Sequence, residues 1–198
     1  MNGGRCPHVR KRAHQPAGRL MRILGLDPGL VLTGWGVVDV LPPRVVLVAG
    51  GVVRLTPRQS IAQRLVELER ELEGLFDEYR PDVCAVEELY SHYAHPRTAI
   101  LMAHARGVIL LAAERRGVGI RQFPANRIKQ SITGYGHASK TQIQRAIQAL
   151  WNLPQPPAPP DVADALAVAV CCGRAAGMAG LHGQRPLDSG SRTGKKPT

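Results

Sequence analysis

Cysteine is scarce in this sequence, and long apolar runs are missing. The 198 residues include four cysteines, two of them adjacent. So few cysteines exclude a disulfide framework and indicate a reducing compartment, which we expect to be the cytoplasm. No uncharged apolar run reaches the roughly 18 residues that a membrane span needs, and no apolar segment follows the basic start as it does in a signal peptide. We therefore expect a globular protein with no membrane segment.

Acidic residues are also scarce in one part of the chain. Segment 91–160 carries nine basic residues and one acidic residue, whereas segment 21–90 carries seven basic and 11 acidic residues. The whole chain has a formal net charge of +11. Positive charge that is segregated in this way indicates a face that binds a polyanion such as nucleic acid. The alternative is a solvated surface that only aids solubility.

The two ends of the chain lack periodic apolar residues and are rich in Gly, Pro, Ser and Arg. This composition predicts a basic disordered arm over residues 1–20 and a basic disordered tail over residues 179–198. Between them we expect one domain over residues 21–178, a common domain size.

Apolar patterns within that domain predict nine elements. Short apolar runs bounded by turn residues predict strands, and apolar residues at three- and four-residue steps predict helices. The strands are expected at 22–27, 33–40, 45–55, 83–89 and 118–123, and the helices at 60–80, 98–116, 139–150 and 161–176. Three meandering strands followed by alternating strands and helices predict an α/β fold, a mixed sheet covered by helices. The first and fourth strands can then be neighbours at its centre.

Two acidic residues close apolar strands. Asp27 ends the first strand before Pro-Gly, and Glu87 closes the apolar part of the fourth strand, with Glu88 beside it. A charge there costs several kcal/mol unless it is paired or holds a metal, although a turn-forming Asp is the alternative for Asp27. Glu87 and Glu88 point to opposite faces of a strand, so only one of them can join Asp27. Alternation alone leaves open which one does.

Asp161 and Asp164 lie three residues apart in the first turn of the last predicted helix, on one face. Capping of the helix N-terminus and attraction to the helix dipole account for the presence of one acidic residue there. Two acidic side chains on one face repel each other, and a divalent cation would relieve this repulsion. If this helix start packs beside Asp27 and Glu87, the oxygen ligands suit Mg²⁺ or Mn²⁺. Two such ions can stabilise the attacking and leaving oxygens of a phosphoryl displacement, so with the basic segment the pattern indicates a nuclease.

The order of seven motifs resembles the RuvC family of bacterial Holliday-junction resolvases over roughly residues 21–175. Each motif alone is weak, but their joint order is specific. The motifs are ILGLDPG at 23–29, TGWG at 33–36, AVEELY at 85–90, ARG at 105–107, KQ at 129–130, GYGHASK at 134–140 and DVADALA at 161–167.

The resemblance implies an RNase H-like fold, with a mixed five-stranded sheet of three antiparallel strands and then parallel additions, flanked by helices. It implies a homodimer that makes paired, symmetric, metal-dependent cuts in a four-way DNA junction during recombination and repair, leaving 5′-phosphate and 3′-hydroxyl ends. It also implies a branch-migration helicase complex of the RuvA and RuvB type as partner. The metal-binding catalytic carboxylates would be Asp27, Glu87, Asp161 and Asp164, with two ions per site and Glu88 in a supporting role.

The resemblance also assigns DNA-binding residues. Lys129 and Lys140 match lysines near the scissile phosphate, although exposed surface lysines are the alternative. Tyr90 stands where relatives carry a Phe that stacks on a base, and Asp161 stands where some relatives carry His. The arginines that could contact backbone phosphates are Arg97, Arg106, Arg121, Arg127 and Arg145. The apolar stretch 108–113 is a candidate dimer face.

Three other functions compete with the resolvase. An actin-like or sugar-kinase ATPase shares the Asp27 to Gly36 pattern, but 198 residues leave no room for its second domain. A YqgF-type RNase H-like nuclease that processes RNA has the same strand-end carboxylates. A junction-binding module with a decayed active site is the non-catalytic alternative, against which the four acids argue.

Overall fold

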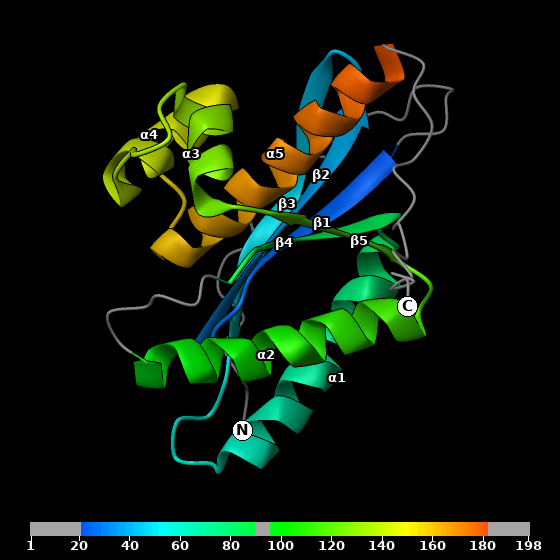
Figure 1. Cartoon of the computed structure of the whole chain (residues 1–198), viewed down its shortest axis with the longest axis vertical. Coiled ribbons are helices and arrows are strands. Elements are labelled where there is room, and N and C mark those ends of the chain that lie inside the picture. Colours follow the sequence, from blue (N-terminus) through cyan, green and yellow to red (C-terminus); the bar gives the residue numbers. More distant parts are fainter. Residues whose placement is uncertain (1–20, 90–95, 182–198) are drawn as a thin grey trace, which may run out of the picture.

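The computed structural model of the chain describes residues 21–89 and 96–181 (Figure 1). Their centre is a five-stranded sheet in the order β3-β2-β1-β4-β5. β1 (Met21–Asp27), β2 (Leu32–Leu41) and β3 (Arg44–Arg54) form an antiparallel meander. β4 (Val83–Glu87) and β5 (Gly119–Phe123) add to it in parallel with β1. The predicted mixed sheet, with the first and fourth strands adjacent, is confirmed.

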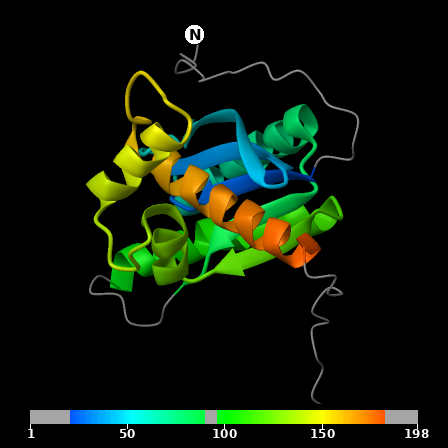
Figure 2. The same cartoon turned by 90° about the horizontal axis from the view of Figure 1, so that it is seen from above.

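Helices cover both faces of the sheet, as Figures 1 and 2 show. One layer holds α1 (Ile61–Tyr79) and α2 (Pro96–Arg115). The other layer holds α3 (Ala125–Thr133), α4 (Lys140–Leu150) and α5 (Pro160–Leu181). None of the described helices is long and apolar enough to cross a membrane.

Local signals explain where the helices begin and end. Ser60 and Ser139 each accept a hydrogen bond from the backbone N–H three residues on, in a full capping box, so α1 and α4 begin where the sequence predicts. The strand predicted over 83–89 ends two residues early, at Glu87. The last helix runs five residues beyond the predicted end, to Leu181.

The helix α3 was not predicted from the sequence, and this is a correction. Its nine residues bury one side chain, Ile128, and Pro124 at its N-cap supplies no side-chain hydrogen bond. Neither apolar periodicity nor a capping residue therefore marks its beginning. The left-handed Gly134 at its C-cap is its one strong local signal.

Alternation along β1 decides which face each residue serves. Ile23 packs in the core under α5, whereas Leu24 and Leu26 pack in the core under α1 and α2. Gly25 and Asp27 fall on the same face as Ile23, because side chains two apart share a face. Asp27 therefore points to the layer of α3, α4 and α5.

Glycines let α5 lie unusually close to the sheet. A Cβ on Gly25 would overlap the Ala165 carbonyl oxygen and lie 2.8 Å from the Ala169 Cβ. A Cβ on Gly34 would lie 2.6 Å from the carbonyl carbon of Asp161. Any side chain at these positions would push the helix away from β1 and β2.

The candidate dimer face at 108–113 has one side in the protein's own core, and its use as a dimer face stays a prediction. Ile109, Ala112 and Ala113 are buried among residues of α1 and the sheet. Leu111 is 48% exposed and is the main apolar side chain that this stretch presents outward. The predicted arm and tail lie outside the described residues, except for helical residues 179–181.

Candidate active site

Two carboxylates meet at one edge of the sheet. Asp27 ends β1 and Glu87 ends β4, and the two strands are parallel neighbours with Leu26 beside Val86. Parallel strands end at the same edge, so the next residues of both strands are also neighbours. Ala85 packs in the core under α5 and Val86 in the core under α1 and α2, which turns Glu87 toward α5 like Asp27.

The first turn of α5 brings the other two carboxylates to this edge. The Asp161 backbone lies against Gly34, which is the β2 residue paired with Asp27. Asp164, one turn further on, faces a pocket of about 240 Å³ that Asp27 and Glu87 also line. Asp161 does not line this pocket, but its negative charge raises the pKa of Asp27. The four predicted acids thus gather at one end of the molecule.

Glu88 lines the same pocket, which the sequence did not predict. Strict alternation would turn it to the opposite face from Glu87, but β4 ends at Glu87. The Glu88 N–H still donates to the Phe123 carbonyl oxygen at 2.9 Å. The charge of Glu87 is one of those that raise the pKa of Asp27.

Burial and repulsion dominate the electrostatics of Asp27. Burial first, and then the charges of Asp164, Asp161 and Glu87, raise its pKa from 3.8 to about 7, while Lys140 opposes the shift. Without a cation, an Asp in this place holds its proton near neutral pH. A pocket that disfavours its own negative charge so strongly is a good site for a cation.

Two lysines face the carboxylates across the pocket. Lys140 Nζ lies 3.1 Å from Asp164 Oδ2, and this ion pair raises the pKa of Lys140. Burial, followed by the Asp164 charge, raises the pKa of Glu87, while Lys129 and Lys140 lower it. Both predicted lysines thus line the carboxylate pocket and partly neutralise it.

The donor set fits a hard divalent cation. The pocket offers carboxylate oxygens, which Mg²⁺ and Mn²⁺ prefer. Within the part of the chain that the structure describes, no three such groups already lie close enough together to hold a metal. The ion pair with Lys140 occupies one oxygen of Asp164, so a bound cation would compete with this lysine. The residues therefore fit a metal after a local rearrangement.

None of the predicted phosphate-binding arginines whose side chains the structure describes lines this pocket. Arg106 is half-buried and donates to the Glu87 carbonyl oxygen at 3.4 Å and to the Gln122 side chain, so it supports the end of β4. Arg121 and Arg145 are exposed on β5 and α4. Arg97 lies in α2, and its side chain, like the whole of Tyr90, lies outside the description.

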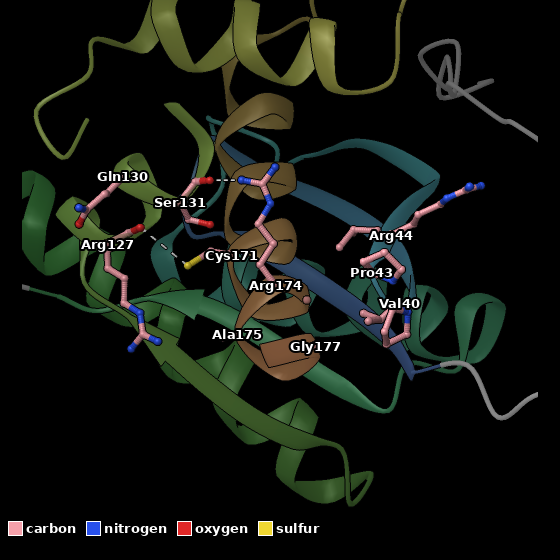
Figure 3. Close-up of a pocket in the computed structure, with 13 residues that line it drawn as sticks. Val40, Pro43, Arg44, Arg127, Gln130, Ser131, Cys171, Arg174, Ala175 and Gly177 are labelled. Carbon is pink, nitrogen blue, oxygen red and sulfur yellow. Dashed lines mark hydrogen bonds between the residues drawn. The ribbon is translucent and has the colours of Figure 1, made fainter. Parts of the chain in front are cut away.

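Arg127 lines a different cavity, shown in Figure 3. This apolar cavity has a volume of about 740 Å³ and lies beside the β2–β3 turn and the later turns of α5. Arg44 and Arg174 also line it, and the Arg127 guanidinium lies 5.3 Å from the centre of the Phe123 ring.

One exposed aromatic residue received no role from the sequence. Tyr135, in the loop between α3 and α4, is 59% exposed. The sequence could have drawn attention to this residue. The chain has only eight Phe, Tyr and Trp residues, and Tyr135 lies within a polar, Gly-rich motif, where an exposed position is expected.

A mixed five-stranded sheet with carboxylates gathered across the ends of β1 and β4 defines the RNase H-like class of nucleases. The family described as crossover junction endodeoxyribonuclease RuvC matches residues 23–172. The chain therefore belongs to the RuvC family and is a nuclease.

Individual relatives agree with this assignment. The chain is 45% identical to the RuvC of Rhodopirellula baltica over 149 residues, which are 75% of this chain and 84% of that protein. It is 43% identical to the RuvC of Heliobacterium modesticaldum, over 77% of this chain and 93% of the relative. Membership of this nuclease family implies a requirement for a divalent metal.

Solved structures share the fold. The RuvC of T. thermophilus in complex with Holliday junction substrate matches with a TM-score of 0.74 and 31% identity, over 80% of this chain and 96% of that one. The yeast mitochondrial Holliday junction resolvase Ydc2 matches with a TM-score of 0.60 over 82% of this chain and 84% of that one. Its identity is 15%, so this likeness shows the fold alone.

Proposed function

We propose that this protein resolves four-way DNA junctions by paired hydrolysis of phosphodiester bonds, leaving 5′-phosphate and 3′-hydroxyl ends. The observation that carries this proposal is the pocket in which Asp27, Glu87 and Asp164 face Lys129 and Lys140. A relative with 31% identity has been solved with a Holliday junction substrate, which supports the same substrate here.

The carboxylates would hold two Mg²⁺ or Mn²⁺ ions per site, with Asp27, Glu87, Asp161 and Asp164 as ligands. Such ions would supply charge neutralisation at the attacking and leaving oxygens of the phosphate. The raised pKa of Asp27 is the most direct support for cation binding at this site, because burial and acidic neighbours raise it to about 7. A carboxylate in this environment gains more from a nearby cation than one in water does.

The lysines would orient the substrate phosphate. Lys140 is 76% exposed, while its ammonium group is held at the pocket by Asp164. Asp164 would then hold a cation with the oxygen that now pairs with Lys140, and the Lys140 ammonium group would be available to bind a phosphate of the DNA. Lys129 lies on α3 at the same pocket, and the exposed Arg121 and Arg145 would add contacts to the DNA backbone.

Two copies of the chain would act together. Each chain contributes one set of the four carboxylates, so symmetric cuts in two opposed strands need two chains related by a two-fold axis. The branch-migration helicase complex and the cytoplasmic location stay predictions of the family resemblance.

A strand-cleavage assay tests the proposal. A labelled four-way junction, a linear duplex of the same sequence and single-stranded RNA are incubated with Mg²⁺, Mn²⁺ or EDTA. We expect paired nicks in the junction only, which are lost in EDTA and in Asp27→Asn, while Asp27→Asn still binds the junction. Tight binding without cleavage would instead favour the junction-binding module, and cleavage of RNA alone would favour the RNA-processing nuclease.

A further inference from the structure

The apolar cavity beside the later turns of α5 has no part in the proposed reaction, and it is large. Its volume of about 740 Å³ lies within the range of ligand-binding pockets, roughly 300–1,000 Å³. Val40 and Cys171 are buried at its floor, and the exposed residues Pro42 and Pro43 of the β2–β3 turn form part of its rim. An apolar cavity with exposed apolar residues at its rim is typical of a surface that binds a partner.

Three arginines surround this apolar lining without a countercharge. Arg44 comes from β3, Arg127 from α3 and Arg174 from α5, and none of the described residues that line the cavity is acidic. Within the described part of the chain, none of these arginines forms an ion pair. Figure 3 shows that their guanidinium groups point in different directions. The cavity thus combines an apolar interior with separate positive charges around it.

These two features define the chemistry of the occupant. Apolar groups would cover the lining, and several separate anionic groups would match arginines that point in different directions and that one compact anionic group does not reach together. A protein segment that carries apolar side chains together with Asp and Glu meets both conditions. Nucleic acid fits less well, because protein–DNA interfaces are more polar than this lining.

The two ends of this chain have the wrong charge to occupy the cavity. Residues 1–20 carry five basic residues and no acidic residue, and residues 182–198 carry four basic residues and one acidic residue. Either end would bring further positive charge to the three arginines, which repel it. The charge of the cavity therefore favours an acidic segment of another protein.

The α5 wall of the cavity has room for a helix. Its lining residues run from Cys171 to Gly177, which at about 1.5 Å per residue is a length of about 9 Å, or nearly two helical turns. A Cβ on Gly177 would have no neighbour within 4 Å, so the surface of α5 is open at this residue. A helix of a partner can therefore approach the α5 backbone closely.

We propose that the apolar cavity is a docking site for an acidic amphipathic helix of a partner protein. The apolar face of that helix fills the cavity and packs against α5 at Gly177, and its Asp and Glu side chains pair with Arg44, Arg127 and Arg174. None of the described residues lines both this cavity and the carboxylate pocket. Docking of the partner and cleavage of DNA therefore use separate parts of the molecule.

A synthetic peptide tests the proposal. The probe is a fluorescein-labelled helical peptide with Leu along one face and Glu beside it, and its binding to the full chain is measured by fluorescence anisotropy. We expect Gly177→Leu, which places a side chain in the open space at α5, to weaken binding about tenfold or more. Arg44→Gln should weaken it about two- to fivefold, as expected for an exposed ion pair.

Two controls separate shape from charge. Gly74→Leu is the matched variant, because a Cβ on this exposed glycine of α1 also has no neighbour within 4 Å, and it should bind the peptide like the unchanged protein. A second peptide with Lys in place of Glu should bind about tenfold more weakly than the acidic peptide. Urea denaturation verifies that both glycine variants fold, and if Gly177→Leu does not, Arg44→Gln and the Lys peptide decide the outcome.

Several results would overturn the proposal. A folded Gly177→Leu variant that binds the acidic peptide within twofold of the unchanged protein shows that the peptide binds elsewhere, and equal affinity for the Glu and Lys peptides shows that the arginines do not select the partner. Binding of dodecanoate, which has one anionic group, without binding of the acidic peptide assigns the cavity to a small amphiphile. A change of oligomeric state in Gly177→Leu assigns it to a second copy of this chain, and weaker junction binding in EDTA assigns it to DNA.

The proposed function fails in a different way. Because the two sites share none of the described residues, Gly177→Leu should bind and cut the four-way junction like the unchanged protein. An unchanged protein that binds the acidic peptide and neither binds nor cuts the junction overturns the resolvase and keeps the docking site. An unchanged protein that cuts the junction normally and does not bind the acidic peptide overturns the docking site alone.

Discussion

The carboxylate pocket and the apolar cavity are both lined in part by α3 and α5 and have opposite characters. α5 supplies Asp164 and Ala167 to the pocket of about 240 Å³, and Cys171 and Arg174 to the cavity of about 740 Å³. α3 likewise turns Lys129 toward the first of them and Arg127 toward the second. Figure 3 shows that Arg174 points from α5 toward Ser131, to whose carbonyl oxygen its guanidinium donates.

The difference shows that volume is a poor guide to chemistry in this fold. The larger cavity has an apolar lining, and its charged residues are three arginines, none of them facing a carboxylate there. The smaller pocket concentrates charge of both signs where burial makes charge costly. Groups with strongly shifted pKa values are concentrated at functional sites. The smaller pocket, where buried charges shift the pKa of Asp27, is therefore the place where the reaction is expected.

The sharpest test removes one charge at each place. Asp164→Asn should lower junction cleavage by about 10³-fold or more, because it removes a proposed ligand of a metal that would stabilise the transition state by several kcal/mol. Arg44→Gln, at the apolar cavity, should leave cleavage within about twofold. Cleavage rates are measured with saturating metal, and junction binding in EDTA verifies that both variants still hold DNA. An equal loss in Arg44→Gln would show that the two regions are not functionally distinct.

The second prediction concerns the dependence of stability on pH. The folded pKa of Asp27 is about 7, above its ordinary 3.8, so the native state binds more protons than the unfolded state between these values. Unfolding free energy therefore falls as pH rises from about 4 to about 7, by up to roughly 4 kcal/mol. In Asp27→Asn this fall in unfolding free energy should be absent. The variant should therefore be more stable than the unchanged protein at pH 8 in EDTA.

Thermal unfolding in EDTA at pH 5 and pH 8 measures this difference. The raised pKa of Glu87 acts in the same direction in both proteins, so the difference between them reports the loss of the Asp27 charge and of its effect on its neighbours. A variant no more stable than the unchanged protein at pH 8 would show that the Asp27 charge is already compensated.

The third prediction compares two glycines under α5. A Cβ at Gly25, near the carboxylate end, would overlap the Ala165 carbonyl oxygen, which cannot move without the helix. Gly25→Ala should thus cost about 2–3 kcal/mol of unfolding free energy and reduce cleavage, since it displaces Asp161 and Asp164. At Gly173, beside the apolar cavity, a Cβ would lie 3.1 Å from a Val45 methyl and 3.2 Å from a Val40 methyl.

These methyl groups can shift toward the cavity, and alanine favours the helix over glycine. Gly173→Ala should therefore stay within about 1 kcal/mol of the unchanged protein and keep its activity. Chemical denaturation and the cleavage rate are measured on both variants. Equal destabilisation by the two substitutions would contradict the idea that only the carboxylate end of α5 is held in close contact with the sheet.

The smallest effect is expected at Arg174. Its guanidinium donates to the Ser131 carbonyl oxygen and links α5 to α3 beside the apolar cavity. Arg174→Gln should cost about 1 kcal/mol of unfolding free energy through this hydrogen bond, with no change in the cleavage rate. Urea denaturation gives the free energy, and a cleavage defect larger than the stability loss would extend the functional site into this region.

Much of the fold and of the candidate site could be predicted from the sequence, because the signals were local. Ser60 and Ser139 begin capping boxes, and both helices start there. Asp27 and Glu87 end apolar strands, and two adjacent parallel strands bring their ends to one edge. α3 was missed because it buries one side chain and has no side-chain cap, so its position depends on packing against α4 and α5.

Sequence alone determined the order of the predicted elements, the four carboxylates and the resemblance to the RuvC family, since each depends on residue types at fixed spacing. Alternation along the strand left open whether Glu87 or Glu88 joins Asp27. The tertiary structure turns Glu87 toward Asp27, in agreement with the resemblance, because the buried face of a strand depends on which helices cover it. Tertiary packing likewise turned Arg106 toward the Glu87 carbonyl and left Tyr135 in solvent. Burial and neighbouring charge come from segments far apart in the chain, and no local pattern encodes them.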